Sequence, residues 1–393
     1  MQLKSRIIDS KIGAENILLE MTYEEYLEIA KDILMNNPLQ RKRVKSSNTV
    51  YSLLKKDLLE GCIMPPIVLA LNLENDSDFF KLDNESIIDL VKSNIENLLI
   101  LDGLQRTHTL KDLESELREE TNDFDKFIKF RNGMLRVEIY IGINQFGILY
   151  RMLTLNTGQT PMSLRHQIEI LYRKYLDNAI EGIEIVQEVN KDTASPNAYH
   201  FKTLVEGFNS YLERDPAPID RFDVLNNIKS LERLSNENTQ NDLFKDFVLT
   251  YDNLIKAIDN KTSANLSDDE VLDELSLYAS PFSKNTIGVF NKSQAITGFG
   301  AAIGKLKDLE VIENLDEVRD LVNKLEVAED EDWIVDLIKN LDSIKQNSKK
   351  IGNAQRMYFY WIFRELFNEN SDAYTNLYEA VQTGYKKYQL TSE

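Results

Sequence analysis

The chain has 393 residues, 42% of them hydrophobic, with 65 Asp and Glu against 46 Lys and Arg and a single Cys. This length and apolar content predict two or three folded domains, and one Cys excludes an internal disulfide. The net charge of −19 divides into −7 over residues 1–200 and −12 over residues 201–393, which excludes a protein that binds nucleic acid through a broad basic surface. No apolar run approaches the ~20 residues of a membrane helix, and we expect a cytoplasmic protein that contacts no membrane.

Two amphipathic helices and a buried strand are predicted within the first 73 residues. Residues 21–35 and 49–62 carry apolar side chains at helical spacing, and Gly61 stands where a helix C-cap belongs. Residues 63–73 form an apolar run that opens on two prolines, which the start of a strand tolerates. Cys62, next to this run, is expected to be a buried core residue.

A strand, a tight turn and a helix are predicted in succession from residue 98. Residues 98–101 are an apolar run of strand length, and the dipeptide Asp102-Gly103 interrupts it before apolar residues recur at helical spacing up to Leu117. Residues 134–143 alternate apolar and polar side chains, as a strand does. Two more helices are predicted, over 144–158 and after Pro161.

After about residue 178 the strand patterns fade. Loops are predicted over 258–270 and 280–296, and the glycine-rich stretch 298–306 predicts a small-residue helix that packs closely. The aromatic stretch 358–367 is interpreted as core or as an oligomer contact rather than as a stacking platform for bases. Helices are predicted over 199–213, 241–258, 268–278, 316–326, 331–346 and 354–367. The chain therefore reads as an α+β domain over 1–178 followed by a mostly helical domain of unknown role over 179–393.

Polar and flexible residues gather at the turn after the strand over 98–101. The first residues of a helix carry unpaired N–H groups that favour an anion, and Gly103 lets the main chain approach a ligand closely. Arg106 could pair with a phosphate, while Asp102 could hold a metal or orient water and Gln105 could position a nucleophilic water. The alternative is a purely structural junction, with Asp102 as the helix cap and Arg106 in a salt bridge.

The string LILDGLQRTHTL (99–110) is similar to the DGQQR/DGQHR motif of the ParB-like superfamily. That superfamily includes DndB-type regulators of DNA phosphorothioation, the NTPase half of GmrSD-type restriction enzymes and SspE-type defence proteins. Three further stretches resemble the family in the right order. They are NPLQRKR (37–43), the helix, glycine and "PPI" strand of 49–71, and LTLNTGQTPMSLRHQIE (153–169).

The resemblance implies a ParB/sulfiredoxin-like core that binds a nucleoside triphosphate, with Mg²⁺, or a nucleic-acid phosphate. It implies catalytic roles for Asp102, Gln105 and Arg106. Leu104 departs from the family, which has Gln at this position, so a polar contact is lost and any NTP hydrolysis is expected to be weak. The residues implicated in nucleotide binding are Gly103, Gln40, Arg41, Arg43 and Asn156.

We therefore expect a nucleotide- or DNA-phosphate-binding protein of a DNA-modification or anti-phage defence system, and a weak NTP hydrolase if it is an enzyme. The alternative is a non-catalytic regulatory or assembly subunit, which Leu104 and the acidic charge favour. The expected partners are a nucleotide, DNA through a local patch, and a protein partner or a second copy of the chain. Three His and one Cys predict no structural zinc site, and the sequence contains neither a P-loop nor a recognisable nuclease motif.

Overall fold

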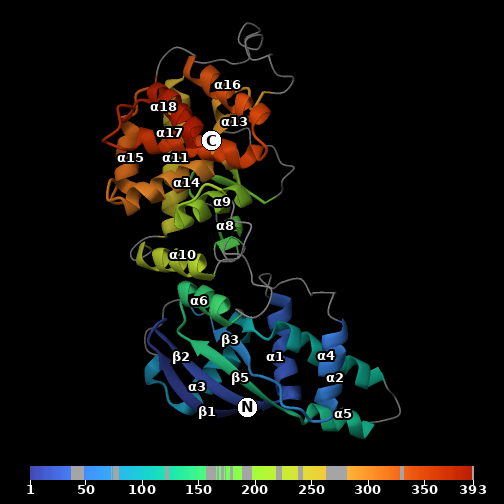
Figure 1. Ribbon diagram of the computed structural model, residues 1–393. Helices are drawn as coiled ribbons and strands as arrows, with labels where there is room; N and C mark the ends of the chain where they lie inside the picture. The colour runs from blue at the N-terminus through green and yellow to red at the C-terminus, as the bar shows by residue number, and fades with distance from the viewer. Residues whose placement is uncertain are drawn as a thin grey trace. The chain divides into compact units, whose positions relative to one another are not determined.

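The computed structural model divides the chain into two compact units, Met1–Pro161 and Met162–Glu393 (Figure 1). Helices and strands are mixed, which confirms the predicted α+β class. The predicted helix over 268–278 lies outside the described residues, as does most of the helix predicted after Pro161. The structure describes residues 1–36, 48–71, 73, 79–119, 124–155, 165, 168–169, 172, 174–177, 180–187, 197–217, 224–237, 242–262, 281–327 and 332–391.

The division between the units precedes the domain boundary that we expected after residue 178. We assigned Ile168 and Tyr172 to the N-terminal domain, but both belong to the second unit, and both are buried. The Tyr172 ring stacks on Phe244 with centroids 4.5 Å apart, and it meets Phe208 edge-on at 5.6 Å. These aromatic contacts hold this part of the chain to the helical unit.

The N-terminal unit is built on one mixed sheet with the strand order β1-β2-β5-β3-β4. All neighbouring strands run antiparallel except β3 and β5, which are parallel. The strands are β1 Gln2–Asp9, β2 Ala14–Thr22, β3 Ile67–Leu71, β4 Leu98–Asp102 and β5 Met134–Ile141. The predicted strands over 63–73, 98–101 and 134–143 are thereby confirmed as β3, β4 and β5.

Core residues lie on both faces of this sheet at the strand β3, so β3 is buried on two sides. On β3, Ile67, Leu69 and Leu71 join the larger core cluster, to which α1 to α5 contribute, while Val68 and Ala70 join a second cluster with α6. This explains why β3 is an unbroken apolar run. The helices of this unit are α1 Tyr23–Asn36, α2 Asn48–Leu59, α3 Asn84–Ser93, α4 Leu104–Glu119, α5 Phe124–Arg131 and α6 Gln145–Leu155, with short 3₁₀ turns at Phe79–Lys81 and Ile95–Asn97.

Cys62 is exposed, and the prediction that it is buried is wrong. The chain leaves α2 through Gly61, which has a φ of +88°. Cys62 follows this turn and precedes β3, which begins only at Ile67, so it lies before the buried part of the apolar run.

Among its described residues the C-terminal unit is mostly helical, and the strands β6 Glu184–Val186 and β7 Ala198–His200 pair in a two-stranded sheet. In the part of the chain that the structure describes, no helix has the length and apolar content needed to span a membrane. The helices are α8 Lys174–Asp177, α9 Phe201–Glu213, α10 Val224–Glu237, α11 Leu243–Lys261, α13 Thr286–Phe290, α14 Ser293–Asp308, α15 Leu315–Asn323, α16 Asp332–Asn347, α17 Ile351–Leu366 and α18 Leu377–Thr391.

Helix α14 packs closely between α9 and α17 because small residues face both neighbours. A Cβ at Gly300 would lie 2.2 Å from the Gly207 carbonyl oxygen in α9, and one at Gly298 would lie 2.4 Å from the Phe359 Cβ in α17. The predicted small-residue helix is therefore confirmed. The loop predicted over 280–296 is partly wrong, since it contains α13 and the start of α14. The aromatic side chains of α17 are largely buried, which confirms their interpretation as core.

Gly300→Ala should destabilise the C-terminal unit by about 1–3 kcal/mol, because the added methyl group forces α14 away from α9. The matched control is Gly352→Ala in the first turn of α17, where the nearest atom to the added Cβ is the end of the Arg356 side chain at 3.3 Å. Alanine otherwise favours a helix over glycine by up to ~1 kcal/mol. Urea unfolding monitored by circular dichroism compares the two variants, and equal stability would contradict close packing at Gly300.

Candidate functional site

The turn between β4 and α4 requires glycine at residue 103. Gly103 has a φ of +99°, a conformation that other residues rarely adopt. A Cβ at this position would also lie 3.0 Å from the Ile67 Cγ1 and 3.3 Å from the Ile67 Cα. The turn therefore rests directly against the first residue of β3, and this contact places the start of α4 beside the start of β3.

The first turn of α4 is held by two hydrogen bonds to Gly103 and by one hydrogen bond to α1. The Thr107 N–H donates to the Gly103 carbonyl at 2.9 Å, and the Thr107 hydroxyl donates to the same oxygen at 3.0 Å. The Tyr26 hydroxyl lies 2.7 Å from the Thr107 hydroxyl oxygen. Tyr26 is fully buried, and this burial raises the pKa of its hydroxyl well above the ordinary value. The hydroxyl thus stays protonated and holds α4 to α1.

Arg106 joins the beginning of β3 to the end of β4. Its Nη1 donates to the carbonyl oxygens of Pro65 at 2.9 Å and Pro66 at 3.0 Å, and its Nη2 donates to the Asp102 carboxylate. Because β3 and β4 are antiparallel, the residues before β3 lie beside the residues that end β4. Arg106 is four residues after Asp102, one helical turn away, and so reaches both. We call this set of contacts the Arg106 clamp.

The clamp matches the structural alternative for these two residues, in which Arg106 forms a salt bridge. The side chains of Arg106 and Asp102 are only 16% and 18% exposed. Three of the five guanidinium N–H donors are engaged by two carbonyls and a carboxylate, so the closed clamp leaves Arg106 few donors for a phosphate. The Asp102 carboxylate is likewise engaged, in an ion pair with Arg106.

Leu104 and Gln105 face different surroundings at the start of α4. Leu104 packs against the larger core cluster of the N-terminal unit, which accounts for an apolar residue at this position. Gln105 is half-buried, and its carbonyl accepts a hydrogen bond from the Thr109 hydroxyl at 2.9 Å. By the geometry of a helix, the N–H groups of residues 104–106 precede the first intrahelical bond.

The structure brings together Asp102, Gly103, Gln105 and Arg106 at this one turn. Gln40, Arg41, Arg43 and Asn156 lie outside the described residues. Among the residues that the structure does describe, no group of three or more His, Cys, Asp or Glu side chains is placed to hold a metal ion.

Sequence reasoning did not include the two proline carbonyls or the Tyr26–Thr107 pair. One pattern could have pointed to the carbonyls. The "PPI" stretch and the DGLQR motif both resemble the ParB-like superfamily, and this suggests that the two stretches lie close together in the fold. Proline offers no main-chain N–H, so its carbonyl is the only main-chain group it can present to a partner. No comparable signal marked Tyr26, which lies 81 residues before Thr107.

Comparison of the chain with protein-family models, with curated proteins and with solved structures gives no match.

Arg106→Ala should lower the free energy of unfolding by about 2–4 kcal/mol, because it leaves two carbonyls and a carboxylate without their donor in a half-buried place. Arg106→Lys should lose most of the same amount, since one ammonium cannot reproduce the fork. The matched control is Arg118→Ala on the same helix, whose side chain is 64% exposed and lies 3.4 Å from Glu114.

We expect a change of less than about 0.5 kcal/mol for this exposed control. Chemical denaturation of the three variants measures the difference. If Arg106→Ala and Arg118→Ala lose similar small amounts, the guanidinium does not hold the turn.

Proposed function

We propose that the Met1–Pro161 unit binds a phosphate-bearing ligand, a nucleotide or DNA, at the β4–α4 turn, as part of a DNA-modification or anti-phage defence system. The observation that carries the proposal is the start of α4 at a glycine with positive φ, packed on β3 and fixed by the Arg106 clamp. The defence context rests on the resemblance of four ordered sequence stretches to the ParB-like superfamily.

In this proposal the main-chain N–H groups of residues 104–106 and the Gln105 side chain contact the phosphate. N–H groups at a helix N-terminus suit an anion, and the helix dipole adds to the attraction. The clamp serves binding indirectly. It pairs the Asp102 carboxylate with Arg106, so that no uncompensated negative charge faces the phosphate, and it fixes the turn before the ligand arrives.

The proposed ligand is bound rather than hydrolysed. Hydrolysis by the scheme that the motif suggests requires Arg106 to stabilise phosphate charge and Asp102 to handle metal or water. Both side chains are engaged with each other, and Leu104 packs against the core where the resembled motif has a polar residue. If Mg²⁺ accompanies a bound nucleotide, its ligands would come chiefly from the phosphates.

A second candidate is a regulatory or assembly subunit that acts through protein partners without binding a phosphate. The structural use of Arg106 and Asp102 favours it, because the motif then needs no ligand to account for its residues. The two candidates differ in one measurable property, which is phosphate binding at Gln105.

Gln105→Glu should weaken binding of ATP with Mg²⁺, or of a short DNA duplex, about tenfold, because it puts a negative charge beside the phosphate. An acidic residue in the first turn favours a helix, so the fold should be retained. The matched control is Gln346→Glu, the same change at an exposed position of α16 in the other unit. Isothermal titration calorimetry of the full chain compares the three proteins.

Absence of binding by both ATP and duplex DNA would favour the second candidate, as would equal binding by Gln105→Glu and the control. Phosphate release from ATP tests the absence of hydrolysis separately. Hydrolysis that is lost in Asp102→Ala would show that the clamp opens during a catalytic cycle and would overturn the binding-only proposal.

A further inference from the structure

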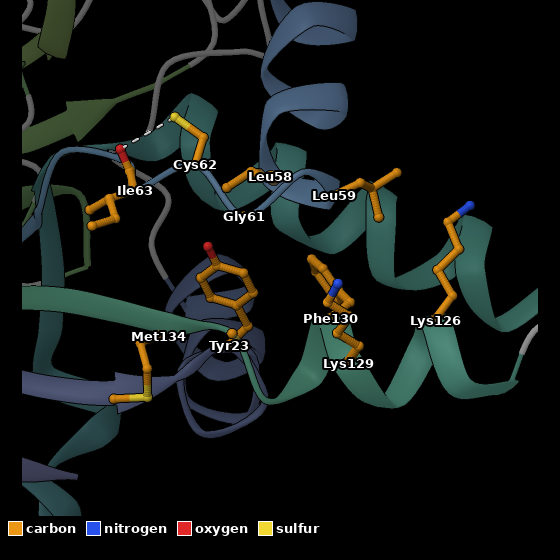
Figure 2. A pocket seen from close by; sticks show the side chains of 11 residues that line it. Tyr23, Leu58, Leu59, Gly61, Cys62, Ile63, Lys126, Lys129, Phe130 and Met134 are labelled. Carbon is orange, nitrogen blue, oxygen red and sulfur yellow. Dashed lines mark hydrogen bonds between the residues drawn. The ribbon is translucent and has the colours of Figure 1, made fainter.

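A pocket of about 250 Å³ lies in the N-terminal unit, between the C-terminal end of α2, the helix α5 and the start of β5 (Figure 2). None of the residues that line it belongs to the β4–α4 turn. Its walls are largely apolar, with contributions from Leu58, Phe130 and Met134. At its edge Ile63 and Met134 are 80% and 56% exposed, so apolar surface remains open to water at this place. Such surface is suited to a ligand with an apolar body.

Tyr23 contributes a polar group to the pocket wall. Its side chain is only 4% exposed, its ring packs on Phe130 with centroids 5.2 Å apart, and Figure 2 shows its hydroxyl pointing toward the stretch that carries Cys62 and Ile63. Within the described part of the chain, no residue forms a hydrogen bond with this hydroxyl. Burial raises the pKa of Tyr23, so the hydroxyl is a neutral donor. A hydroxyl that faces the pocket in this way can donate a hydrogen bond to a ligand acceptor.

Two lysines supply the charge of the pocket. Lys126 and Lys129 rise from α5 in Figure 2, and among the described residues that line the pocket they are the charged ones. They lie on a different wall from the Tyr23 hydroxyl. The pocket therefore offers a positive side, an apolar middle with two aromatic rings, and a hydroxyl donor.

We propose that this pocket binds a small aromatic carboxylate that carries a hydrogen-bond acceptor at the end opposite its carboxylate. The carboxylate lies toward Lys126 and Lys129, the ring packs among Leu58, Phe130 and Met134, and the acceptor meets the Tyr23 hydroxyl. A cavity of 150 Å³ holds a benzene molecule, so by proportion this pocket holds roughly ten non-hydrogen atoms. A substituted phenylacetate has this size.

The chain offers a direct reporter, because Cys62 is its single cysteine, is exposed and lines the pocket. The rate of Cys62 alkylation by iodoacetamide, an uncharged reagent, is measured on the full chain with increasing 4-hydroxyphenylacetate. We expect saturable slowing of the reaction. Phenylacetate lacks the acceptor and tyrosol lacks the carboxylate, and each should need a concentration about threefold to tenfold higher for the same protection.

Two variants assign these differences to residues. Tyr23→Phe should abolish the difference between 4-hydroxyphenylacetate and phenylacetate while leaving the disadvantage of tyrosol. The double variant Lys126→Gln/Lys129→Gln should abolish the disadvantage of tyrosol while leaving the difference between 4-hydroxyphenylacetate and phenylacetate. The control Lys324→Gln, at an exposed lysine of the other unit, should behave as wild type. Lack of protection, equal protection by all three compounds, or an unchanged order in both variants would overturn the proposal. The lysine changes are at or near the surface, so this arm holds even if Tyr23→Phe lowers stability.

Discussion

One guanidinium group connects three elements of the N-terminal unit. Arg106 satisfies the carbonyls of Pro65 and Pro66 and the carboxylate of Asp102, and so connects the start of β3, the end of β4 and the first turn of α4. Without the Arg106 side chain, these acceptors would be half-buried and would lack a hydrogen-bond donor. They lie at the turn where Gly103 packs against Ile67. Arg106 thus joins two stretches that lie far apart in the sequence, residues 65–66 and 102–106, into one structural unit.

The same contact decides how the turn can meet a phosphate. An arginine that is free in a pocket recognises phosphate through its fork, but the fork of Arg106 already holds three acceptors of the protein itself. In the proposed function, phosphate recognition therefore falls to the main chain of α4 and to Gln105. A turn fixed in advance loses little conformational entropy when a ligand binds, which suits binding. Hydrolysis would require Asp102 and Arg106 to separate at a cost of several hydrogen bonds.

The sequence predicted the elements that show a clear hydrophobic pattern. It did not predict the parts of the fold that charged residues complete. The strands β3 and β4 were predicted from unbroken apolar runs, β5 from the alternation of apolar and polar residues, and the helix α14 from its small residues. The hairpin of β1 and β2 was not, since β1 is mostly exposed and carries charges such as Arg6, which pairs with Glu15 of β2 across 2.7 Å. At the candidate site, the spacing of Asp102 and Arg106 predicted their salt bridge as one alternative. The bonds to Pro65 and Pro66 depend on strand pairing, which a local pattern does not contain.

The stretch of residues 61–66 connects the two places to which we assign ligands. Gly61, Cys62 and Ile63 line the pocket, and Pro65 and Pro66 give the clamp its carbonyls, with only Met64 between them. Met64 is buried in the larger core cluster and anchors the stretch at its middle. A ligand in the pocket can influence the clamp only if it binds two arrangements of this stretch with different affinity. Any such coupling is reciprocal, so a phosphate at the β4–α4 turn would change the affinity of the pocket by the same factor. The short connection makes residues 61–66 the part of the fold in which that coupling would be carried.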